Sequence, residues 1–131
     1  MSTTKYEVIF EPFTQRHYIK TFAKKYKGAW EITLSYLVDE FRSPDVLFSK
    51  SIAETIVDSG RIKICKTEFK IAGTQESRHG SGNRCIVAVH NDTCTVHVLL
   101  VYHKNDLGGQ NETAEWKKAI RDNYPRYSDI M

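Results

Sequence analysis

The hydrophobic pattern of this chain changes its period near Arg61. Before that point most apolar side chains recur at helical spacing, and the clearest stripe is Trp30, Leu34, Leu37, Val38 and Phe41. After Arg61 apolar and polar residues alternate with a period of two, which is typical of β-strands. Helices and strands therefore fall largely in separate stretches of chain, and this favours an α+β fold over alternating βα units.

The N-terminal third predicts one short strand and a helical hairpin. Residues 6–10 (YEVIF) are aromatic and β-branched and are closely followed by Pro12, which predicts a strand. Helical spacing continues over 14–28 and 30–41 and stops at Pro44. Two adjacent amphipathic helices that meet at a glycine predict a hairpin laid on a sheet.

Two further helices are predicted elsewhere in the chain. Residues 51–58 (SIAETIVD) predict a short third helix, although Ile56 and Val57 leave a strand open. Near the C-terminus, Trp116 and Ile120 lie one turn apart on a last helix with an acidic first turn.

The second half predicts three strands, over 61–71, 84–90 and 93–103, with a polar loop at 73–82. Apolar residues of the first of these strands fall on both even and odd positions. A flat strand with one buried face cannot bury both sets, so we expect a bulge or break near 66–68.

The resulting order is β-α-α-(α)-β-β-β-α. It predicts one α+β domain over residues 1–131, with an N-terminal strand and a helical hairpin packed on a small antiparallel sheet. Consecutive strands would form a meander, with the helices on one face. A length of 131 residues suits a single domain.

The net charge of +3 conceals an uneven distribution. Residues 14–28 hold five basic residues and no acidic one, residues 31–58 hold six acidic against two basic, and residues 61–84 hold six basic against two acidic. A polyanion would therefore meet local basic patches. The alternative for residues 14–28 is an ordinary solvated helix face.

Several classes of protein have no support in the sequence. The three cysteines, Cys65, Cys85 and Cys94, include no CxxC pair and fit reduced thiols of a cytoplasmic protein. No apolar stretch approaches the roughly 18 residues of a membrane span, and no secretory signal is visible. Nucleotide-cofactor and metalloprotease motifs are absent, so we expect no cofactor and no metal.

Polar residues gather in the strands of the second half. Arg84 begins one strand and His103 ends the next, and in a meander these two positions should be neighbours, with Lys66 and Lys70 on the adjoining strand. Even-numbered positions of the last strand share one face: Val96, Val98, Leu100, Tyr102 and Lys104. This set starts uniformly apolar, so we expect it to meet the helices.

A cluster of His, Arg, Lys and Tyr without a metal site suits RNA cleavage. A base takes the proton of the 2′-hydroxyl, an acid protonates the departing 5′-oxygen, and cations stabilise the phosphorane. His103 suits either proton role and Arg84 suits the phosphate. The alternative for His103 is an ordinary surface histidine, and Arg78 and His79 in the loop are either solvated or contact substrate.

The run FKIAGTQESRHGSGNRCIVAVHNDTCTVHVLLVYHKNDL resembles the sheet core of the RelE/ParE toxin superfamily. In that family a strand with a basic residue leads through a glycine-containing loop to an arginine that starts the next strand. A hairpin then adds a hydrophobic strand with a polar end. The strand YEVIF and the helical stretch 14–41 are similar to the family's opening, so the resemblance spans about residues 5–125.

This resemblance implies a toxin of a toxin–antitoxin system, many of which cut mRNA, often in the ribosomal A site. Lys70 matches the family's basic strand position, Arg84 the phosphate-facing arginine, and His103 with Lys104 the acid–base position at the strand end. Together with the residue chemistry, this predicts catalytic roles for Lys70, Arg84, His103 and Lys104, and substrate contacts for Lys66, Arg78, His79 and Tyr102.

The implied partners are a cognate antitoxin protein, mRNA and the ribosome, and we expect a hetero-oligomer with the antitoxin, which would cover the basic surface. Two alternatives remain open at this point. One is a gyrase-inhibiting toxin of the ParE type, and the other is a non-catalytic RNA-binding domain on the same fold.

Overall fold

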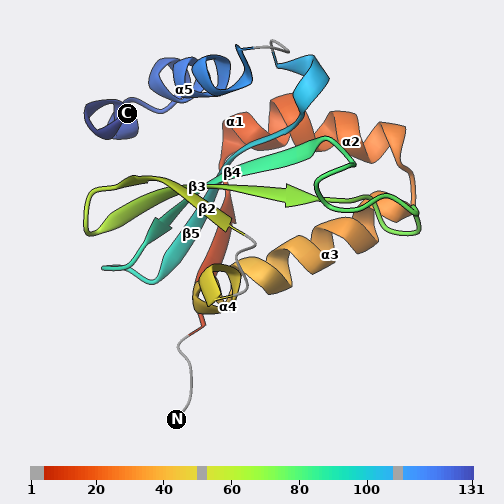
Figure 1. Cartoon of the computed structure of the whole chain (residues 1–131), viewed down its shortest axis with the longest axis horizontal. Helices are drawn as coiled ribbons and strands as arrows, with labels where there is room; N and C mark the ends of the chain where they lie inside the picture. Colours follow the sequence, from red (N-terminus) through yellow and green to blue (C-terminus); the bar gives the residue numbers. More distant parts are fainter. Residues whose placement is uncertain (1–4, 50–52, 108–110) are drawn as a thin grey trace.

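The computed structural model describes residues 5–49, 53–107 and 111–131. The chain forms one five-stranded mixed sheet with helices on both sides (Figure 1). Its elements are β1 Glu7–Phe10, α1 Pro12–Thr14, a π-helical turn η1 Gln15–Ile19, α2 Lys20–Lys25, α3 Ala29–Phe41, α4 Pro44–Ser49, β2 Ala53–Asp58, β3 Ile62–Phe69, β4 Asn83–His90, β5 Thr95–His103, η2 Lys104–Asp106, α5 Glu112–Asn123 and η4 Pro125–Ile130.

The strands are arranged in the order β1-β5-β4-β3-β2. Strands β2 to β5 form an antiparallel meander, which confirms the predicted pairing of the last three strands. Strand β1 pairs in parallel with β5, so the prediction of a purely antiparallel sheet is wrong. The helices α1 to α4 and the meander separate β1 from β5 along the chain, and such a long connection permits the parallel arrangement.

The segment predicted as a third helix is the edge strand β2 over the residues that the structure describes. Ser51 and Ile52 of that prediction lie outside the described residues. The β-branched residues Thr55, Ile56 and Val57 favour a strand, and pairing with β3 decides in its favour. A bulge between Thr55 and Val57 disturbs the two-residue alternation, so the consecutive residues Ile56 and Val57 both pack against the cluster under α5.

Both faces of the sheet are covered, so the prediction of helices on one face is wrong. One hydrophobic cluster joins the sheet to α2, α3 and α4. The other joins it to α5 and η4, where Trp116, Ile120 and Tyr127 are fully buried. Figure 1 shows α5 above the sheet and α3 with α4 below it.

Coverage of both faces explains why β3 has no break. The strand runs continuously from Ile62 to Phe69, so the bulge predicted near 66–68 is wrong. Ile64 packs in the cluster under α5 and Cys65 in the cluster under α3, and both are fully buried. A strand with two buried faces buries even and odd positions alike.

The register shift that does occur inside the sheet lies in β5, at Leu99. Ile86 pairs with Leu100, whereas Val87 pairs with Val98, which leaves Leu99 as the extra residue. As a result, Val96 and Val98 pack toward α3 while Leu100 and Tyr102 pack toward α5. The prediction that these four residues share one face is therefore wrong.

Candidate functional site

The polar residues predicted to form a site converge on one end of the sheet, but they point in different directions. Glu68 lies opposite Arg84, and Arg84 lies opposite Tyr102. His103 lies opposite Asn83, one position away from Arg84 in the register. Successive residues of a strand point to opposite faces, so the side chains of Arg84 and His103 do not form one cluster.

Arg84 is buried in an ionic network beneath α5. Its side chain is 5% exposed, and its Nε atom lies 4.0 Å from carboxylate oxygens of both Glu68 and Glu112. Tyr102 donates a hydrogen bond of 2.7 Å to Glu112. Burial, followed by the interaction with Glu112, raises the pKa of the Tyr102 hydroxyl. The guanidinium is already neutralised by two carboxylates, so Arg84 and Tyr102 join the sheet to α5.

His103 lies on the other side of the strand end, in a groove beside α2. Strand β1 pairs with Thr95–Val98, so among the described residues the second half of β5 has no strand neighbour on that side, and α1 and η1 contact β5 instead. Two adjoining cavities, of about 390 and 90 Å³, share His103 and form what we call the His103 groove. Its polar lining residues are His17, Tyr18, Thr21, Lys25, Tyr26, Asn83, Tyr102, His103 and Asp106.

The backbone fixes the position of the His103 ring. Nδ1 of His103 accepts a hydrogen bond of 3.1 Å from the Asn105 backbone N–H. The neutral ring then carries its proton on Nε2, which makes Nε2 a donor. The ring lies over Gly82, where an added Cβ would stand only 2.5 Å from Nε2.

His17 also lines the His103 groove, although the sequence did not point to it. It belongs to the π-helical turn η1, a rare conformation that occurs frequently at functional sites. The signal in the sequence was the basic block at 14–28. Five exposed basic side chains lie on η1, on α2 and just after α2: Arg16, Lys20, Lys24, Lys25 and Lys27.

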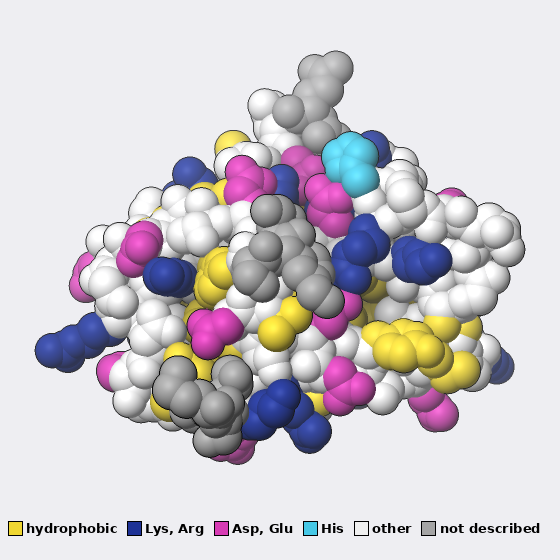
Figure 2. Space-filling model, turned by 60° about the horizontal axis from the view of Figure 1, so that its bottom comes forward, with side chains coloured by type: hydrophobic (Ala, Val, Ile, Leu, Met, Phe, Trp, Pro, Cys, Tyr) yellow, Lys and Arg dark blue, Asp and Glu magenta, His cyan; other side chains and the backbone are white. Residues whose placement is uncertain are grey.

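A larger cavity, about 540 Å³, lies between α3 and the end of β3, and we call it the α3–β3 cavity. It takes in two predicted site residues, Lys70 and Arg78. Two large hydrophobic side chains of α3 are exposed to solvent: Ile32 at 52% and Tyr36 at 62%. Figure 2 shows hydrophobic side chains next to basic ones on this face.

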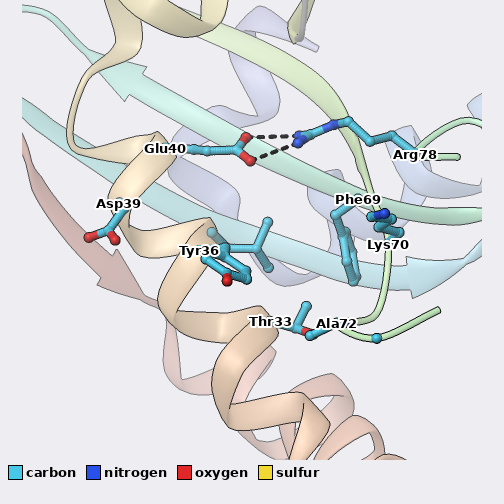
Figure 3. A pocket seen from close by; sticks show the side chains of 10 residues that line it. Thr33, Tyr36, Asp39, Glu40, Phe69, Lys70, Ala72 and Arg78 are labelled. Carbon is cyan, nitrogen blue, oxygen red and sulfur yellow. Dashed lines mark hydrogen bonds and ion pairs between the residues drawn. The ribbon is translucent and has the colours of Figure 1, made fainter. Parts of the chain in front are cut away.

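The walls of the α3–β3 cavity are held by specific contacts. Arg78 donates two hydrogen bonds, of 2.7 and 2.8 Å, to the two carboxylate oxygens of Glu40 (Figure 3). The Thr33 hydroxyl donates to the Ala29 carbonyl at 2.9 Å and accepts from the Ala72 backbone N–H at 2.8 Å. The Arg78–Glu40 pair and the Ala72–Thr33 hydrogen bond join the segment after β3 to α3.

The other predicted site residues lie apart from both cavities. Lys66 pairs with Glu54 at 3.8 Å, and His79 contacts Glu68 at 2.9 Å. Lys104 follows His103 and is exposed at the start of η2. The residues predicted to form one site are thus mostly distributed over the Arg84 network, the His103 groove and the α3–β3 cavity.

A further polar cluster lies at the opposite end of the sheet. His97 Nδ1 lies 2.9 Å from Glu11, and Arg126 donates a hydrogen bond of 2.6 Å to the same carboxylate oxygen. His90 Nε2 lies 2.7 Å from the Tyr127 hydroxyl. These contacts tie the C-terminal turn η4 to β4, β5 and the residue after β1.

The cysteines do not supply a nucleophile to these sites. All three are free, and Cys65 and Cys85 are fully buried. Burial raises the pKa of Cys65 to about 11, which keeps its thiol protonated at neutral pH.

No family model matches this chain, and neither a curated protein nor a solved structure does. In the part of the chain that the structure describes, no group of His, Cys, Asp and Glu side chains is arranged to hold a metal ion. Within the same ranges no helix has both the length and the apolar character to cross a membrane.

Proposed function

We propose that this protein is an endoribonuclease that cuts mRNA by attack of a 2′-hydroxyl on the adjacent phosphate, in the His103 groove. The observation that carries the proposal is that His17 and Lys25 line the two adjoining cavities that share His103. Histidine exchanges protons near neutral pH, and a lysine neutralises charge that develops on phosphate.

The hydrogen bonding of His103 favours a division of roles. Because Nδ1 accepts from Asn105, the neutral ring offers Nε2–H as a donor, which suits the scissile phosphate and the departing 5′-oxygen. His17 is exposed on η1 and is the histidine left to take the proton of the 2′-hydroxyl. Asp106 lines the same groove and balances part of its positive charge.

The basic block beside the groove supplies affinity for RNA. The five basic side chains around α2 are exposed, and Lys25 also lines the groove. Exposed cations attract a phosphate backbone independently of its sequence and give affinity that falls with salt. In this proposal the exposed cations bind the RNA phosphates. The family resemblance gave that role to Arg84, which is already paired with Glu68 and Glu112.

The proposal includes the setting implied by the RelE-like pattern. The protein acts as the toxin of a toxin–antitoxin pair, and a cognate antitoxin covers the basic face around α2. The ribosome presents the mRNA, which supplies the substrate positioning that a shallow groove lacks.

Induced expression in a bacterial host tests the proposal. Growth arrest is expected, together with mRNA fragmentation that primer extension on total RNA detects. His103→Ala and His17→Ala should each lower cleavage by about 100-fold or more, because each removes a proton-transfer or donor group. Translating ribosomes with purified protein give the same readout in vitro.

Lys25→Ala tests the phosphate contact and has a matched control in Lys118→Ala. Lys118 is also an exposed helical lysine, but it lies on α5 and pairs with Asp122 at 3.6 Å. Lys25→Ala should weaken cleavage and Lys118→Ala should not. Wild-type cleavage by folded His103→Ala and His17→Ala proteins would refute the assignment, and DNA-damage signalling with intact mRNA would favour gyrase inhibition.

A second candidate function is RNA binding without cleavage. The ion pairs of Arg84 with Glu68 and Glu112 favour it, because the arginine at the centre of the family resemblance is not free to hold a phosphate. This candidate predicts salt-dependent RNA binding that His103→Ala leaves unchanged, with RNA recovered intact.

A further inference from the structure

We infer that the α3–β3 cavity binds one unstacked nucleotide of a single-stranded RNA, with the base against Tyr36 and the phosphate at Lys70. The inference rests on the proposed function for the class of substrate only. It requires that the protein binds RNA, and it does not require that the protein cuts it.

The size and lining of the cavity suit a base. Its volume of about 540 Å³ falls within the range of small-molecule sites, roughly 300–1,000 Å³. Leu37 and Phe69 are buried and give it an apolar floor. Tyr36 is a large aromatic side chain that is nevertheless 62% exposed, and Figure 3 shows it between the α3 backbone and Phe69. Exposed aromatic rings of this kind stack on unpaired bases.

The polar groups add hydrogen-bonding selectivity. Glu40 is oriented by its two hydrogen bonds from Arg78, and its carboxylate oxygens retain further lone pairs. An ionised carboxylate only accepts hydrogen bonds, so it favours bases that carry an exocyclic amino group. Adenine, cytosine and guanine have that group, and uracil does not.

Lys70 supplies the phosphate contact. Its side chain is exposed, and among the residues that the structure describes it forms no ion pair or hydrogen bond. Lys66, which lies within β3, is by contrast paired with Glu54. Lys70 is therefore a cation at the rim of the cavity that is available to an anion.

The sheet register relates the cavity to the His103 groove. Phe69, Asn83 and His103 lie in one row across β3, β4 and β5. Adjacent strands are about 4.8 Å apart, so the backbone of the row spans about 10 Å. At about 3.4 Å per stacked nucleotide, a strand of RNA covers that distance with a few nucleotides. The groove and the cavity therefore lie at the same end of the sheet, about two strand spacings apart.

The cavity is already formed in the free protein. The Ala72–Thr33 hydrogen bond and the Arg78–Glu40 pair hold the segment after β3 against α3. Ser81 donates to the Arg78 carbonyl at 2.8 Å and restrains the loop that carries Arg78. A preformed site loses little conformational entropy on binding.

Binding of labelled single-stranded oligonucleotides to the whole protein, measured by fluorescence anisotropy, tests the inference. We expect oligo(A) and oligo(C) to bind more tightly than oligo(U). Tyr36→Ala should weaken oligo(A) binding about tenfold, within the usual range for loss of one base–aromatic stack. Lys70→Ala should weaken binding to all three and lower the salt slope by about one.

Ile32→Ala is the matched control for Tyr36→Ala. Ile32 lies one turn earlier on α3 and is also exposed, but it does not line the cavity. A nucleotide site requires that Ile32→Ala bind RNA as wild type does. Equal losses with both variants would mean that the exposed surface of α3, and not the cavity, contacts the RNA, and would overturn the inference.

Glu40→Gln tests the selectivity. This variant should reduce the preference for oligo(A) over oligo(U), and titration of the labelled protein with AMP and UMP should show the same change in NMR shifts of residues around the cavity. Equal shifts with both nucleotides in the wild type would overturn the role of Glu40.

The outcomes separate this inference from the proposed function. RNA that is bound but not cut, with binding lost in Tyr36→Ala, supports the cavity and refutes the nuclease. RNA that is cut normally while Tyr36→Ala and Lys70→Ala bind as wild type supports the nuclease and refutes the cavity. Absence of any RNA binding refutes both.

Discussion

Gly82 meets two demands that no other residue type meets together. Its φ of +78° lies in the left-handed region that L-residues rarely adopt. The His103 ring also lies directly over its Cα, so that an added Cβ would clash with the imidazole. The polar loop before β4 ends at this glycine, and the groove keeps its shape only while the position has no side chain.

Gly82→Ala should therefore cost more than the backbone strain alone. We expect the free energy of unfolding to fall by about 1–2 kcal/mol from φ, with a further loss as His103 is displaced. Gly73→Ala is the control, since Gly73 has a φ of +86° but no atom within 4 Å of an added Cβ. Urea denaturation measures both, and NMR signals of His103 should shift only in Gly82→Ala. Equal destabilisation by the two substitutions would contradict the packing of His103 on Gly82.

Individual residue roles were the least predictable part of the site. The predicted neighbourhood of Arg84 and His103 in the sheet is confirmed, since they lie in adjacent rows of the register, but their side chains point to opposite faces and do not form one cluster. The sequence could not show that Glu112, from a helix at the far end of the chain, would approach Arg84. Nor did it single out His17, because a lone exposed histidine on a helix carries little signal.

Among the secondary-structure elements, α5 determines which side chains of the sheet are buried on its second face. It covers the second face with Trp116 and Ile120, and its first turn places Glu112 beside Arg84 and Tyr102. The bulge at Leu99 serves this arrangement, because it turns Leu100 and Tyr102 toward α5. The extra residue is held in place by Tyr124, whose hydroxyl donates to the Leu99 carbonyl at 2.7 Å.

Trp116→Ala tests the contribution of α5 to stability. The side chain is fully buried, so its removal should lower the free energy of unfolding by about 3–5 kcal/mol. Ile32→Ala on exposed α3 surface should change it by less than about 0.5 kcal/mol. Denaturant unfolding followed by circular dichroism gives both values. A loss in Trp116→Ala no greater than that in Ile32→Ala would show that α5 is not packed as described.

At the scale of the whole molecule, the two ends of the sheet differ in character. One end carries the His103 groove and the α3–β3 cavity, with cations exposed around both. The other end is closed by the His90, His97 and Glu11 cluster, which fastens η4 to the sheet. Burial, followed by repulsion from His97 and Arg126, lowers the pKa of His90.

The shift at His90 predicts a pH dependence of stability. A histidine with a lowered folded-state pKa binds fewer protons when folded than when unfolded, so acid favours unfolding. The contribution of His90 should be fully present above its unfolded pKa of about 6.5 and be lost as the pH falls below that value.

Urea unfolding of wild type and His90→Gln between pH 5 and 8 measures this effect. Glutamine can still hydrogen-bond to Tyr127 but does not titrate, so the variant should lose less stability on acidification. Parallel pH profiles for the two proteins would show that His90 does not contribute to the acid sensitivity.

The local features of this protein follow from its sequence. Residues 29–41 form the predicted helix because the stripe from Trp30 to Phe41 follows the helical repeat, and β4 and β5 form because β-branched residues follow one another. These features depend on neighbours along the chain, and so they can be read from it.

Which residues share a face and a site depends on packing between distant segments of the chain. Coverage of both sheet faces, the parallel pairing of β1 and the bulge at Leu99 depend on contacts between segments far apart in sequence. A single extra residue in β5 reversed the faces of every position after it. For that reason the polar cluster predicted as one site is divided in the fold, with His103 in a groove and Arg84 buried beneath α5.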